Sequence, residues 1–465
     1  MNDTAVTDTA FASLPLSTPM LDTIAALGFT EMTPVQARTL PLILKGQDVI
    51  AQARTGSGKT AAFGIGLLHP LNPRYFGCQA LVLCPTRELA DQVAKDLRRL
   101  ARGEDNIKIL TLCGGVPMGP QVGSLEHGAQ VIVGTPGRVQ KHLLKGSLSL
   151  DGLNTLVLDE ADRMLDMGFY DSIAEIISQT PARRQTLLFS ATYPAGIKQL
   201  GSTFMRDPVQ VKVESPQETR QIEERFYEVS PEARLDAVVK VLYSLRPVSC
   251  VAFCFTRQQC QEVADHLNAK GISAMALNGD LEQRDRDQVL GMFANRSLSV
   301  LVATDVAARG LDIEGLDLVI NVELGRDPET HVHRIGRTGR AGESGIAVSL
   351  VAPPEVRRAL AIEAQQGTPL NWQPLDSVIP HPDRSPLIAP MVTLCIGAGR
   401  KQKLRPGDIL GALTGEVGIP GAQVGKIAIF DHQAYVAVAR EVADQALARL
   451  TTGRIKGKSL RVRAL

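Results

Sequence analysis

The stretch Ala53-Arg54-Thr55-Gly56-Ser57-Gly58-Lys59-Thr60 lies shortly after the strand-like apolar pair Val49-Ile50. Its glycines let the backbone bend so that N–H groups can point at phosphate oxygens, and Lys59 can reach the terminal phosphates of a nucleotide. Ala53 replaces the usual first glycine, so the strict general pattern is not met. The stretch predicts a phosphate-binding loop in which the Thr60 hydroxyl is offered to Mg²⁺. The residues expected to hold the nucleotide are Thr55, Gly56, Ser57, Gly58, Lys59 and Thr60.

A second stretch, Asp159-Glu160-Ala161-Asp162, follows the apolar run 153–158. Such a run predicts a buried parallel strand, and open α/β sheets bind ligands at the carboxyl ends of their strands. Asp159 would hold the metal there, and Glu160 is placed to orient or activate an attacking water. An isolated acidic run is typical of a solvated helix start. The two stretches in this order, each after an apolar strand, instead predict an NTP-hydrolysing enzyme.

The length, composition and charge of the chain limit the classes of protein to which it can belong. A chain of 465 residues is too long for one core and suggests three domains. The apolar content of 44% and the charged content of 21% are ordinary for soluble globular protein. The net charge of +1 hides an asymmetry, because the chain from Ser385 onward carries twelve Lys and Arg against five Asp and Glu. A basic tail predicts contact with a polyanion, and the alternative is a merely soluble basic domain.

Cysteine usage and hydropathy indicate the compartment. Several of the seven cysteines lie in apolar runs, where Cys behaves as a small hydrophobe, and none has zinc-ligand spacing. An odd count without a basic-then-apolar leader predicts a reducing, cytoplasmic location. No apolar run approaches bilayer length, so no membrane partner is expected.

Strands and helices alternate along the chain, as in a doubly wound parallel sheet. The first series has expected strands at 80–84, 107–112, 131–133, 155–158 and 186–189. The second series has expected strands at 248–255, 273–277, 299–303, 318–321 and 345–350. Only the first series has a phosphate loop, so a ligand bound between two α/β lobes is expected.

The last part of the chain has a different pattern. Its expected strands are 392–396, 426–430, 434–439 and 459–462, and its expected helices are 406–414 and 442–450. This βαββαβ order is that of an RNA-recognition module. The expected division is a disordered segment 1–10, a first lobe 11–213, a linker 214–221, a second lobe 222–367, a Pro-rich linker 368–390 and a tail domain 391–465.

Further short motifs fall where strands end, and in order they match the signature set of DEAD-box ATP-dependent RNA helicases. Thr33-Pro34-Val35-Gln36 resembles the adenine-reading motif of that family, in which Gln36 would read the base and Phe11 would stack on it. Alone, Phe11 would be typical of a core residue. The resemblance implies two tandem RecA-like domains, with ATP and Mg²⁺ as cofactors. Departures are small: Val35 and Asn278 stand where Ile and His are common.

The resemblance also implies contacts to the RNA backbone. These contacts start helices or tight turns, where backbone N–H groups are exposed to phosphates, and they carry no sequence information. Ordinary helix capping by Thr86 and Thr135 can hold at the same time. The implied contacts are Pro85, Thr86, Arg87, Gly115, Thr135 and Arg138 in the first lobe, and Gly279, Arg286 and Thr304 in the second.

Other residues take catalytic or coupling roles by the same resemblance. Ser190 and Thr192 would couple hydrolysis to strand separation, although a simple helix cap is the plainer interpretation. Asp312 matches the ribose contact. Arg337 and Arg340 match arginine fingers that reach the γ-phosphate, and a supplied finger is worth roughly 10³–10⁵ in rate in GTPases. Hydrolysis would then need RNA to close the lobes.

The tail resembles the C-terminal RNA-binding domain of the DbpA subfamily, in particular at 399–408 and 453–458. The resemblance implies a 23S ribosomal RNA hairpin as target and a role in large (50S) subunit assembly. Stacking on the sheet is expected to be poor, since Thr393 and Gln433 stand where aromatics are wanted and only Tyr435 is available, at about 1–3 kcal/mol per missing base contact. Recognition is therefore expected from basic loops, unless these charges are only solubilising. The residues concerned are Arg400, Lys401, Lys403 and Arg405, with Arg454, Lys456 and Lys458.

The sequence thus predicts a monomeric RNA-stimulated ATPase that unwinds short duplexes locally and does not act on DNA. One alternative is an RNA-binding scaffold with a clamped ATP site, which the intact Glu160, Arg337 and Arg340 disfavour. Another is a DNA translocase with two recombinase-like lobes, which the tail and the adenine motif disfavour.

Overall fold

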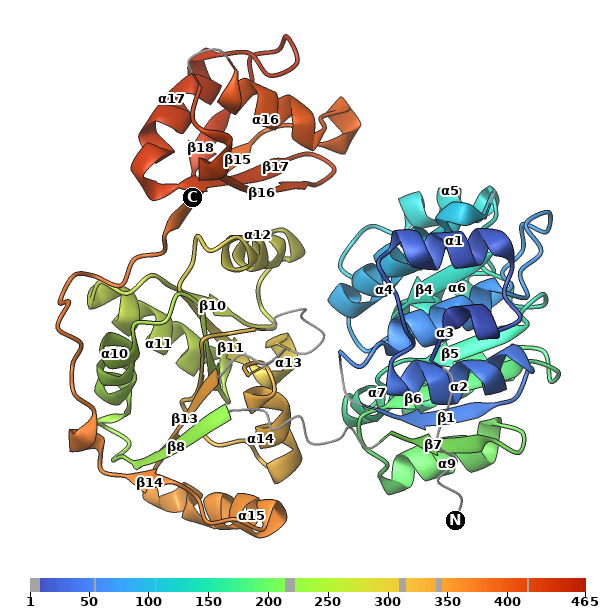
Figure 1. The fold of residues 1–465 in the computed structure, drawn as a ribbon, viewed down its shortest axis with the longest axis horizontal. Coiled ribbons are helices and arrows are strands. Elements are labelled where there is room, and N and C mark those ends of the chain that lie inside the picture. The colour runs from blue at the N-terminus through green and yellow to red at the C-terminus, as the bar shows by residue number, and fades with distance from the viewer. Residues whose placement is uncertain are drawn as a thin grey trace. The chain divides into compact units, whose positions relative to one another are not determined.

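The structure is a computed structural model that describes residues 9–53, 56–104, 106–213, 222–308, 315–339, 345–415 and 418–465. The expected linker 214–221 and most of the expected disordered N-terminus lie outside these residues. The chain forms two compact units, each described here by itself (Figure 1). Unit 1 comprises Met1–Gln217 with Gly310–Asp312, and unit 2 comprises Glu218–Arg309 with Ile313–Leu465.

Unit 1 contains a seven-stranded parallel sheet of order β3-β4-β2-β5-β6-β1-β7. Its strands are β1 (Val49–Gln52), β2 (Ala80–Leu83), β3 (Ile109–Leu112), β4 (Val131–Gly134), β5 (Thr155–Leu158), β6 (Gln185–Ser190) and β7 (Val209–Lys212). Its helices are α1 (Thr18–Ala26), α2 (Pro34–Leu44), α3 (Lys59–Leu68), α4 (Arg87–Leu100), α5 (Gly119–Glu126), α6 (Pro136–Leu144), α7 (Ala161–Asp166), α8 (Tyr170–Ser178) and α9 (Ala195–Phe204). The central strands are almost continuously apolar because helices cover both faces of the sheet.

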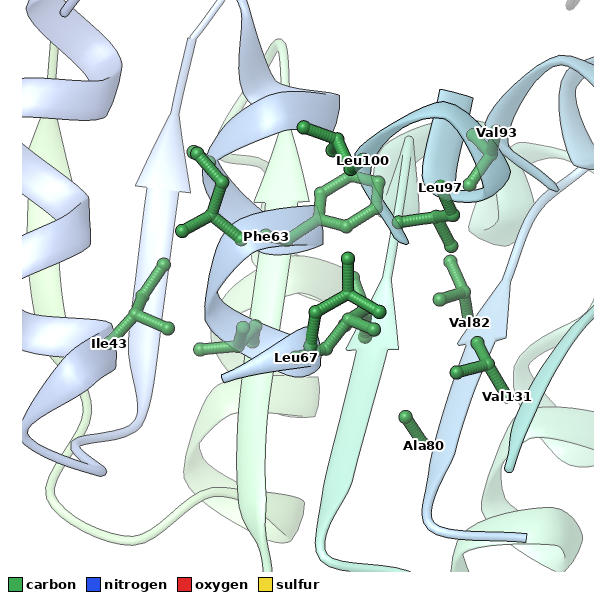
Figure 2. Packing of buried hydrophobic residues seen from close by; sticks show 14 of the residues in the cluster. Ile43, Phe63, Leu67, Ala80, Val82, Val93, Leu97, Leu100 and Val131 are labelled. Atoms are coloured by element: carbon green, nitrogen blue, oxygen red, sulfur yellow. The ribbon is translucent and has the colours of Figure 1, made fainter. Parts of the chain in front are cut away.

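The core on one face of this sheet forms around helix α3. Phe63 and Leu67 of α3 pack against Leu97 of α4 and Val82 of β2 (Figure 2). The ring of Phe63 also meets Phe189 of β6, with centroids 5.4 Å apart. The helix that follows the phosphate loop is therefore anchored on the sheet, which fixes the loop at the carboxyl ends of the strands.

The first part of unit 2, residues 222–366, is called lobe 2 here. Its seven-stranded parallel sheet has the order β10-β11-β9-β12-β13-β8-β14. The strands of lobe 2 itself are β8 (Ile222–Glu228), β9 (Cys250–Cys254), β10 (Ala274–Leu277), β11 (Val300–Thr304), β12 (Leu318–Asn321) and β13 (Gly345–Val351). The segment that follows lobe 2 adds β14 (Trp372–Gln373) beside β8. The helices are α10 (Arg234–Leu245), α11 (Arg257–Ala269), α12 (Gln283–Ala294), α13 (Asp305–Ala308), α14 (Pro328–Ile335) and α15 (Val356–Gln366). The predicted pair of doubly wound sheets is confirmed.

The tail domain is a four-stranded antiparallel sheet of order β16-β17-β15-β18 with two helices. Its elements are β15 (Met391–Ile396), α16 (Pro406–Thr414), β16 (Val424–Ile429), β17 (Ala434–Ala439), α17 (Ala443–Thr452) and β18 (Val462–Ala464). The predicted βαββαβ order is confirmed, but the last strand begins three residues later than its expected start at 459. The helices pack on the face that carries Leu394, Ile396 and Val436.

Residues 371–390, called the strap here, belong to the expected linker 368–390 and are held along lobe 2 (Figure 1). Lys240 Nζ donates to Leu375 O at 2.9 Å, and Ser244 Oγ donates to Ile379 O at 2.6 Å. Val378 and Leu387 are buried in the core of lobe 2. Polar side chains of α10 thus fix one end of the strap, and two apolar side chains anchor the rest.

The tail domain is docked on lobe 2 through the sheet face that its own helices leave uncovered. Asn295 Nδ2 donates to Thr393 Oγ1 at 2.9 Å, and this hydroxyl donates to Ser297 Oγ at 2.8 Å. Tyr435 Cδ2 lies 3.8 Å from the position that a Cβ on Gly291 would occupy. Thr393 and Tyr435 are only 1% and 2% exposed. In the described part of the chain, no helix has the length and apolarity to cross a membrane.

Candidate active site

The phosphate loop leads from β1 into the start of α3. Gly56 and Gly58 have φ angles of 78° and 91°, the left-handed region that favours glycine. Lys59 opens α3 and is 6% exposed, and its Nζ has no hydrogen-bond partner among the described residues. A buried amine without a partner is costly unless an anion binds it, so the loop fits a phosphate. Thr55 lies outside the described residues, and Thr60 is half-buried in the first turn of α3.

Asp159 and Glu160 follow β5 directly. Burial raises the pKa of Asp159 to about 6, Glu160 and Asp162 add to the rise, and Lys59 opposes it. Glu160 has a left-handed backbone, with φ of 49°, and its N–H donates to Asp159 Oδ1 at 3.0 Å. Such a conformation in a non-glycine residue costs of order 1–3 kcal/mol and is concentrated at functional sites. A desolvated carboxylate beside a hydroxyl-bearing loop has the oxygen donors that Mg²⁺ prefers.

The adenine motif is bonded to the phosphate loop. Thr33 Oγ1 donates to Ser57 O at 2.8 Å, and Gln36 Nε2 donates to Gly58 O at 3.1 Å. A Cβ at position 58 would lie 2.6 Å from Gln36 Nε2, so this contact requires glycine. Phe11 is buried in the apolar cluster of unit 1, where a core residue would lie. Its stacking on adenine stays a prediction.

Ser190, Thr192 and Asp162 join the end of β6 to α7. Asp162 Oδ2 accepts from the backbone N–H and the hydroxyl of Thr192, both at 2.9 Å, and from Ala191 N at 3.1 Å. Burial alone would raise the pKa of Asp162, but the hydrogen bonds from Thr192 and Ser190 lower it below its usual value. Asp162 was not among the predicted site residues, although its place in the acidic tetrad was the available signal.

The predicted RNA-contact residues of unit 1 begin helices or turns. Thr86 Oγ1 accepts from Leu89 N at 3.3 Å and so caps α4, whereas Thr135 precedes α6 without a side-chain cap. Pro85 lies just ahead of this cap. Arg87 Nη1 is buried without a hydrogen bond among the described residues. Gly115 has a φ of 75°, so its turn favours glycine.

Arg138 is tied into a polar network that the sequence did not predict. Its guanidinium donates to Gln121 Oε1 and Val116 O, both at 2.8 Å. Gln121 Nε2 donates to Cys113 O at 3.1 Å, and His142 Nε2 lies 3.0 Å from Gln121 Oε1. Because an amide oxygen only accepts, His142 Nε2 carries the proton. The network fixes the turn before Gly115 against α6.

We expect this network to weaken in acid. Burial, with Arg138 and Lys145, holds the pKa of His142 below its usual 6.5. Protonation therefore favours the unfolded state, so the stability contribution is complete above about pH 6.5 and is lost as the pH falls below that value. Thermal unfolding from pH 7.5 to 5.5 should show a steeper fall in Tm for the wild type than for His142→Gln, which cannot titrate. Parallel curves would contradict this assignment.

The segment 334–339, which carries the expected arginine finger Arg337, is buried in lobe 2. Arg334 is 2% exposed, and its Nη2 donates to Asp305 Oδ2 at 2.8 Å while Nη1 donates to Asn321 Oδ1 at 3.0 Å. The guanidinium also lies 5.0 Å from the ring centroid of Phe253. Arg334 was not assigned a role from the sequence; it anchors the motif that carries Arg337, which is 8% exposed. Arg340 and Asp312 lie outside the described residues.

Two predicted RNA contacts of lobe 2 converge on one residue. Arg286 Nη2 donates to Ala307 O at 2.7 Å, and Thr304 Oγ1 accepts from Ala307 N at 3.3 Å. The start of α12 is thereby joined to α13. Gly279 lies ahead of α12, and a Cβ there would meet no atom within 4 Å.

The two basic loops of the tail domain are adjacent. Lys456 Nζ donates to Lys403 O at 2.8 Å and lies 3.8 Å from Asp408 Oδ2. Arg400 Nη2 donates to Ile429 O at 3.0 Å. The exposed side chains of both loops are Arg400, Lys401, Lys403, Arg405, Arg454, Lys456 and Lys458. They form one cluster, called the basic-loop cluster here, which the Lys456–Lys403 hydrogen bond holds together.

A phosphate loop, a desolvated acidic pair and two doubly wound α/β lobes define a two-lobed NTP hydrolase. Family models agree with each part: DEAD/DEAH box helicase matches residues 33–200, Helicase conserved C-terminal domain matches 233–342, and DbpA RNA binding domain matches 393–464.

Individual relatives support the same assignment. The ATP-dependent RNA helicase DbpA of Escherichia coli is 56% identical over 98% of this chain and 100% of its own length. The DEAD-box helicase CshA of Bacillus subtilis is 44% identical over 76% of this chain and 72% of its own length. A structure of S. cerevisiae Dbp5 bound to RNA and ADP BeF3 matches with a TM-score of 0.71 and 31% identity, over 79% of this chain and 96% of that one. The chain belongs to the DEAD-box ATP-dependent RNA helicases and, within them, to the DbpA group.

Proposed function

We propose that this RNA helicase unwinds short RNA duplexes locally, at a 23S ribosomal RNA hairpin of the assembling 50S subunit. It would act as a cytoplasmic monomer, through domains at 11–213, 222–367 and 391–465 joined by the segments 214–221 and 368–390. The proposal that the tail domain targets the enzyme rests on the basic-loop cluster. In this cluster, two exposed loops are held together by the Lys456–Lys403 hydrogen bond. A dense cationic surface of this kind suits a folded polyanion.

The nucleotide site of unit 1 would work as follows. Lys59 neutralises the terminal phosphates, and Gly56, Ser57 and Gly58 with Thr55 surround them. Thr60 and Asp159 would hold Mg²⁺, which, when bound, offsets the negative charge that develops on the phosphates. The Lys59 amine, which has no hydrogen-bond partner in the described part of the chain, and the desolvated Asp159 support this arrangement. Glu160 orients the attacking water.

Contacts from other segments complete this site in the proposal. Gln36 reads adenine, since its amide keeps one N–H and one lone pair beyond its bonds to Gly58 and Thr33. Phe11 stacks on the base and Asp312 contacts the ribose. Arg337 and Arg340 contact the γ-phosphate once RNA brings the two units together.

RNA would bind by its backbone to the helicase units. The donors in unit 1 come from helix starts and tight turns, and Ser190 and Thr192 transmit the nucleotide state through Asp162. Arg138 keeps further N–H donors for phosphate beyond its two internal bonds. The proposed contacts are Pro85, Thr86, Arg87, Gly115, Thr135 and Arg138, with Gly279, Arg286 and Thr304 from lobe 2.

Selection of the RNA falls to the tail domain, and the docking of its sheet supports recognition by loops. Tyr435, the one aromatic at an expected stacking position, is 2% exposed and covered at Gly291. While α12 covers this ring at Gly291, its face is not available for base stacking. Arg400, Lys401, Lys403, Arg405 and Lys456 are exposed and free of this constraint.

A ribosomal RNA fragment that contains the hairpin should stimulate ATP hydrolysis at least about tenfold more strongly than generic RNA at equal concentration. The double variant Lys403→Ala/Lys456→Ala should lose that preference, because two phosphate contacts disappear, while its rate with saturating generic RNA is kept. Steady-state ATPase titrations with both RNAs measure this.

The matched control is Lys426→Ala, which removes an exposed lysine from β16 and should keep the preference. Equal stimulation of the wild type by both RNAs would refute targeting by the tail. A loss in Lys426→Ala alone would instead assign recognition to the sheet.

A further inference from the structure

Helix α12 presents one stripe of side chains toward the docked tail domain. Arg284, Asp287, Gly291 and Asn295 are spaced at i, i+3, i+7 and i+11, so they share one face. Gly291 and Asn295, at one end of the stripe, contact Tyr435 and Thr393 of the tail. The same stripe carries Arg284, whose side chain is exposed, about two helical turns from Gly291.

The tail sheet offers arginines on the face that meets this stripe. Tyr435, Cys395 and Arg463 are successive cross-strand partners on β17, β15 and β18, so their side chains lie on one face. Strands are about 4.8 Å apart, which places Arg463 roughly 10 Å from Tyr435, on the edge strand. Arg463 is exposed, and so is Arg461, two residues before it on the same face.

The charges around Tyr435 agree with this placement. Burial raises the pKa of the Tyr435 phenol to about 12, Cys395 and Asp287 add to the rise, and Arg284 and Arg463 oppose it. One buried phenol thus lies within electrostatic reach of an arginine from lobe 2 and of an arginine from the tail. Asp287 is the carboxylate on the stripe, and its Oδ1 accepts a hydrogen bond from Gln283 Nε2 at 2.7 Å.

We propose that Arg284 of lobe 2 and Arg461 and Arg463 of the tail form one composite surface that binds the RNA phosphate backbone. The inference rests on the proposed function and extends it, because none of these residues belongs to the basic-loop cluster or to the helicase motifs. Guanidinium groups suit phosphate, with which they make charge-assisted, often bidentate hydrogen bonds. RNA is the occupant because the surface is cationic and the chain belongs to the RNA helicases, with a match to the DbpA RNA binding domain over residues 393–464.

The surface exists only while the tail is docked. Its two halves come from segments of the chain far apart in sequence, and the Asn295–Thr393–Ser297 hydrogen bonds and the strap hold them in register.

The test uses the full chain with the double variant Arg284→Glu/Arg463→Glu. Each lost phosphate contact lowers the slope of log affinity against log salt by about 0.7–0.9, so the slope for RNA should fall by about 1.4–1.8. The apparent affinity for RNA should fall at least about tenfold at low salt, while kcat at saturating RNA is unchanged. RNA-stimulated ATPase titrations at several salt concentrations supply both values.

The matched control is Arg357→Glu, the same charge change at an exposed site on α15. A wild-type slope in the double variant, or an equal loss in Arg357→Glu, overturns the composite surface. Absence of RNA-stimulated hydrolysis in the wild type would instead refute the proposed function. Melting curves, with Arg284→Gln/Arg463→Gln as a milder pair, separate a binding defect from misfolding.

A second experiment tests whether the composite surface requires the tail domain to be docked on lobe 2. Gly291→Leu would drive a large side chain into the Tyr435 ring, whereas the Cβ of Gly291→Ala reaches only ordinary contact at 3.8 Å. The leucine variant should show the same loss of salt slope as the double arginine variant, and the alanine variant should keep the wild-type slope. A wild-type slope in Gly291→Leu, with the tail shown by cross-linking to be undocked, contradicts the proposal.

Discussion

Glu160→Gln is expected to lower kcat for RNA-stimulated ATP hydrolysis about 10²–10⁴-fold, the range that a general base or water-orienting carboxylate supplies. The exchange keeps the size of the side chain and removes its charge. ATP affinity should change little, because Lys59 and the glycine loop are unaltered. Single-turnover hydrolysis and binding of a fluorescent ATP analogue measure the two quantities separately.

Glu126→Gln is the matched control, since Glu126 is an exposed glutamate at the end of α5. It should hydrolyse ATP at the wild-type rate. If Glu160→Gln kept more than about a tenth of the wild-type kcat, Glu160 would not have the proposed role. If the Glu160→Gln enzyme lost ATP binding as well, Glu160 would have a structural role instead. That role would come from its buried ion pair, in which Glu160 Oε2 lies 3.3 Å from Arg163 Nε.

Arg337→Ala is expected to lower kcat by a factor that approaches the roughly 10³–10⁵ of arginine fingers in GTPases. The guanidinium offsets charge on the γ-phosphate in the transition state, so KM for ATP should change much less than kcat. Steady-state kinetics at saturating RNA checks this. Arg337→Lys should recover little, because an ammonium lacks the planar fork of donors.

This experiment needs a control variant and a check of folding. Arg326→Ala removes an exposed arginine from the same unit and should leave kcat unchanged. Arg337 is only 8% exposed, so circular dichroism and melting curves must show that lobe 2 of the alanine variant is folded. A folded Arg337→Ala enzyme with normal turnover would refute RNA-driven completion of the active site.

The fold was predictable because its strands are apolar runs. A strand such as β5 has helices on both faces, so every residue is buried and the run is unmistakable. β8, Ile222–Glu228, was missed because its charged residues interrupt the pattern, although it pairs along its whole length with β13. β18 was placed too early because, of its three residues, only Val462 packs against the core of the tail domain and Ala464 is exposed.

The candidate site was predictable where the chemistry lies in one contiguous motif. Lys59 and the Asp159–Glu160 pair each follow a strand, and their neighbours in sequence are their neighbours in space. The network of Gln121, Arg138 and His142 has no such signal, since an interior glutamine resembles a surface one in sequence. The Asn295–Thr393 bond joins residues 98 positions apart and depends on docking that no local pattern encodes.

The strap and the docked sheet have a mechanical consequence. Because lobe 2 and the tail domain share hydrogen bonds and buried side chains, we expect them to move as one body. If the tail domain binds one RNA element while lobe 2 moves during the ATP cycle, that movement pulls the bound element relative to the RNA strand held by the two helicase units. The enzyme must then either release the RNA element bound by its tail once per ATP cycle or change the conformation of the surrounding RNA.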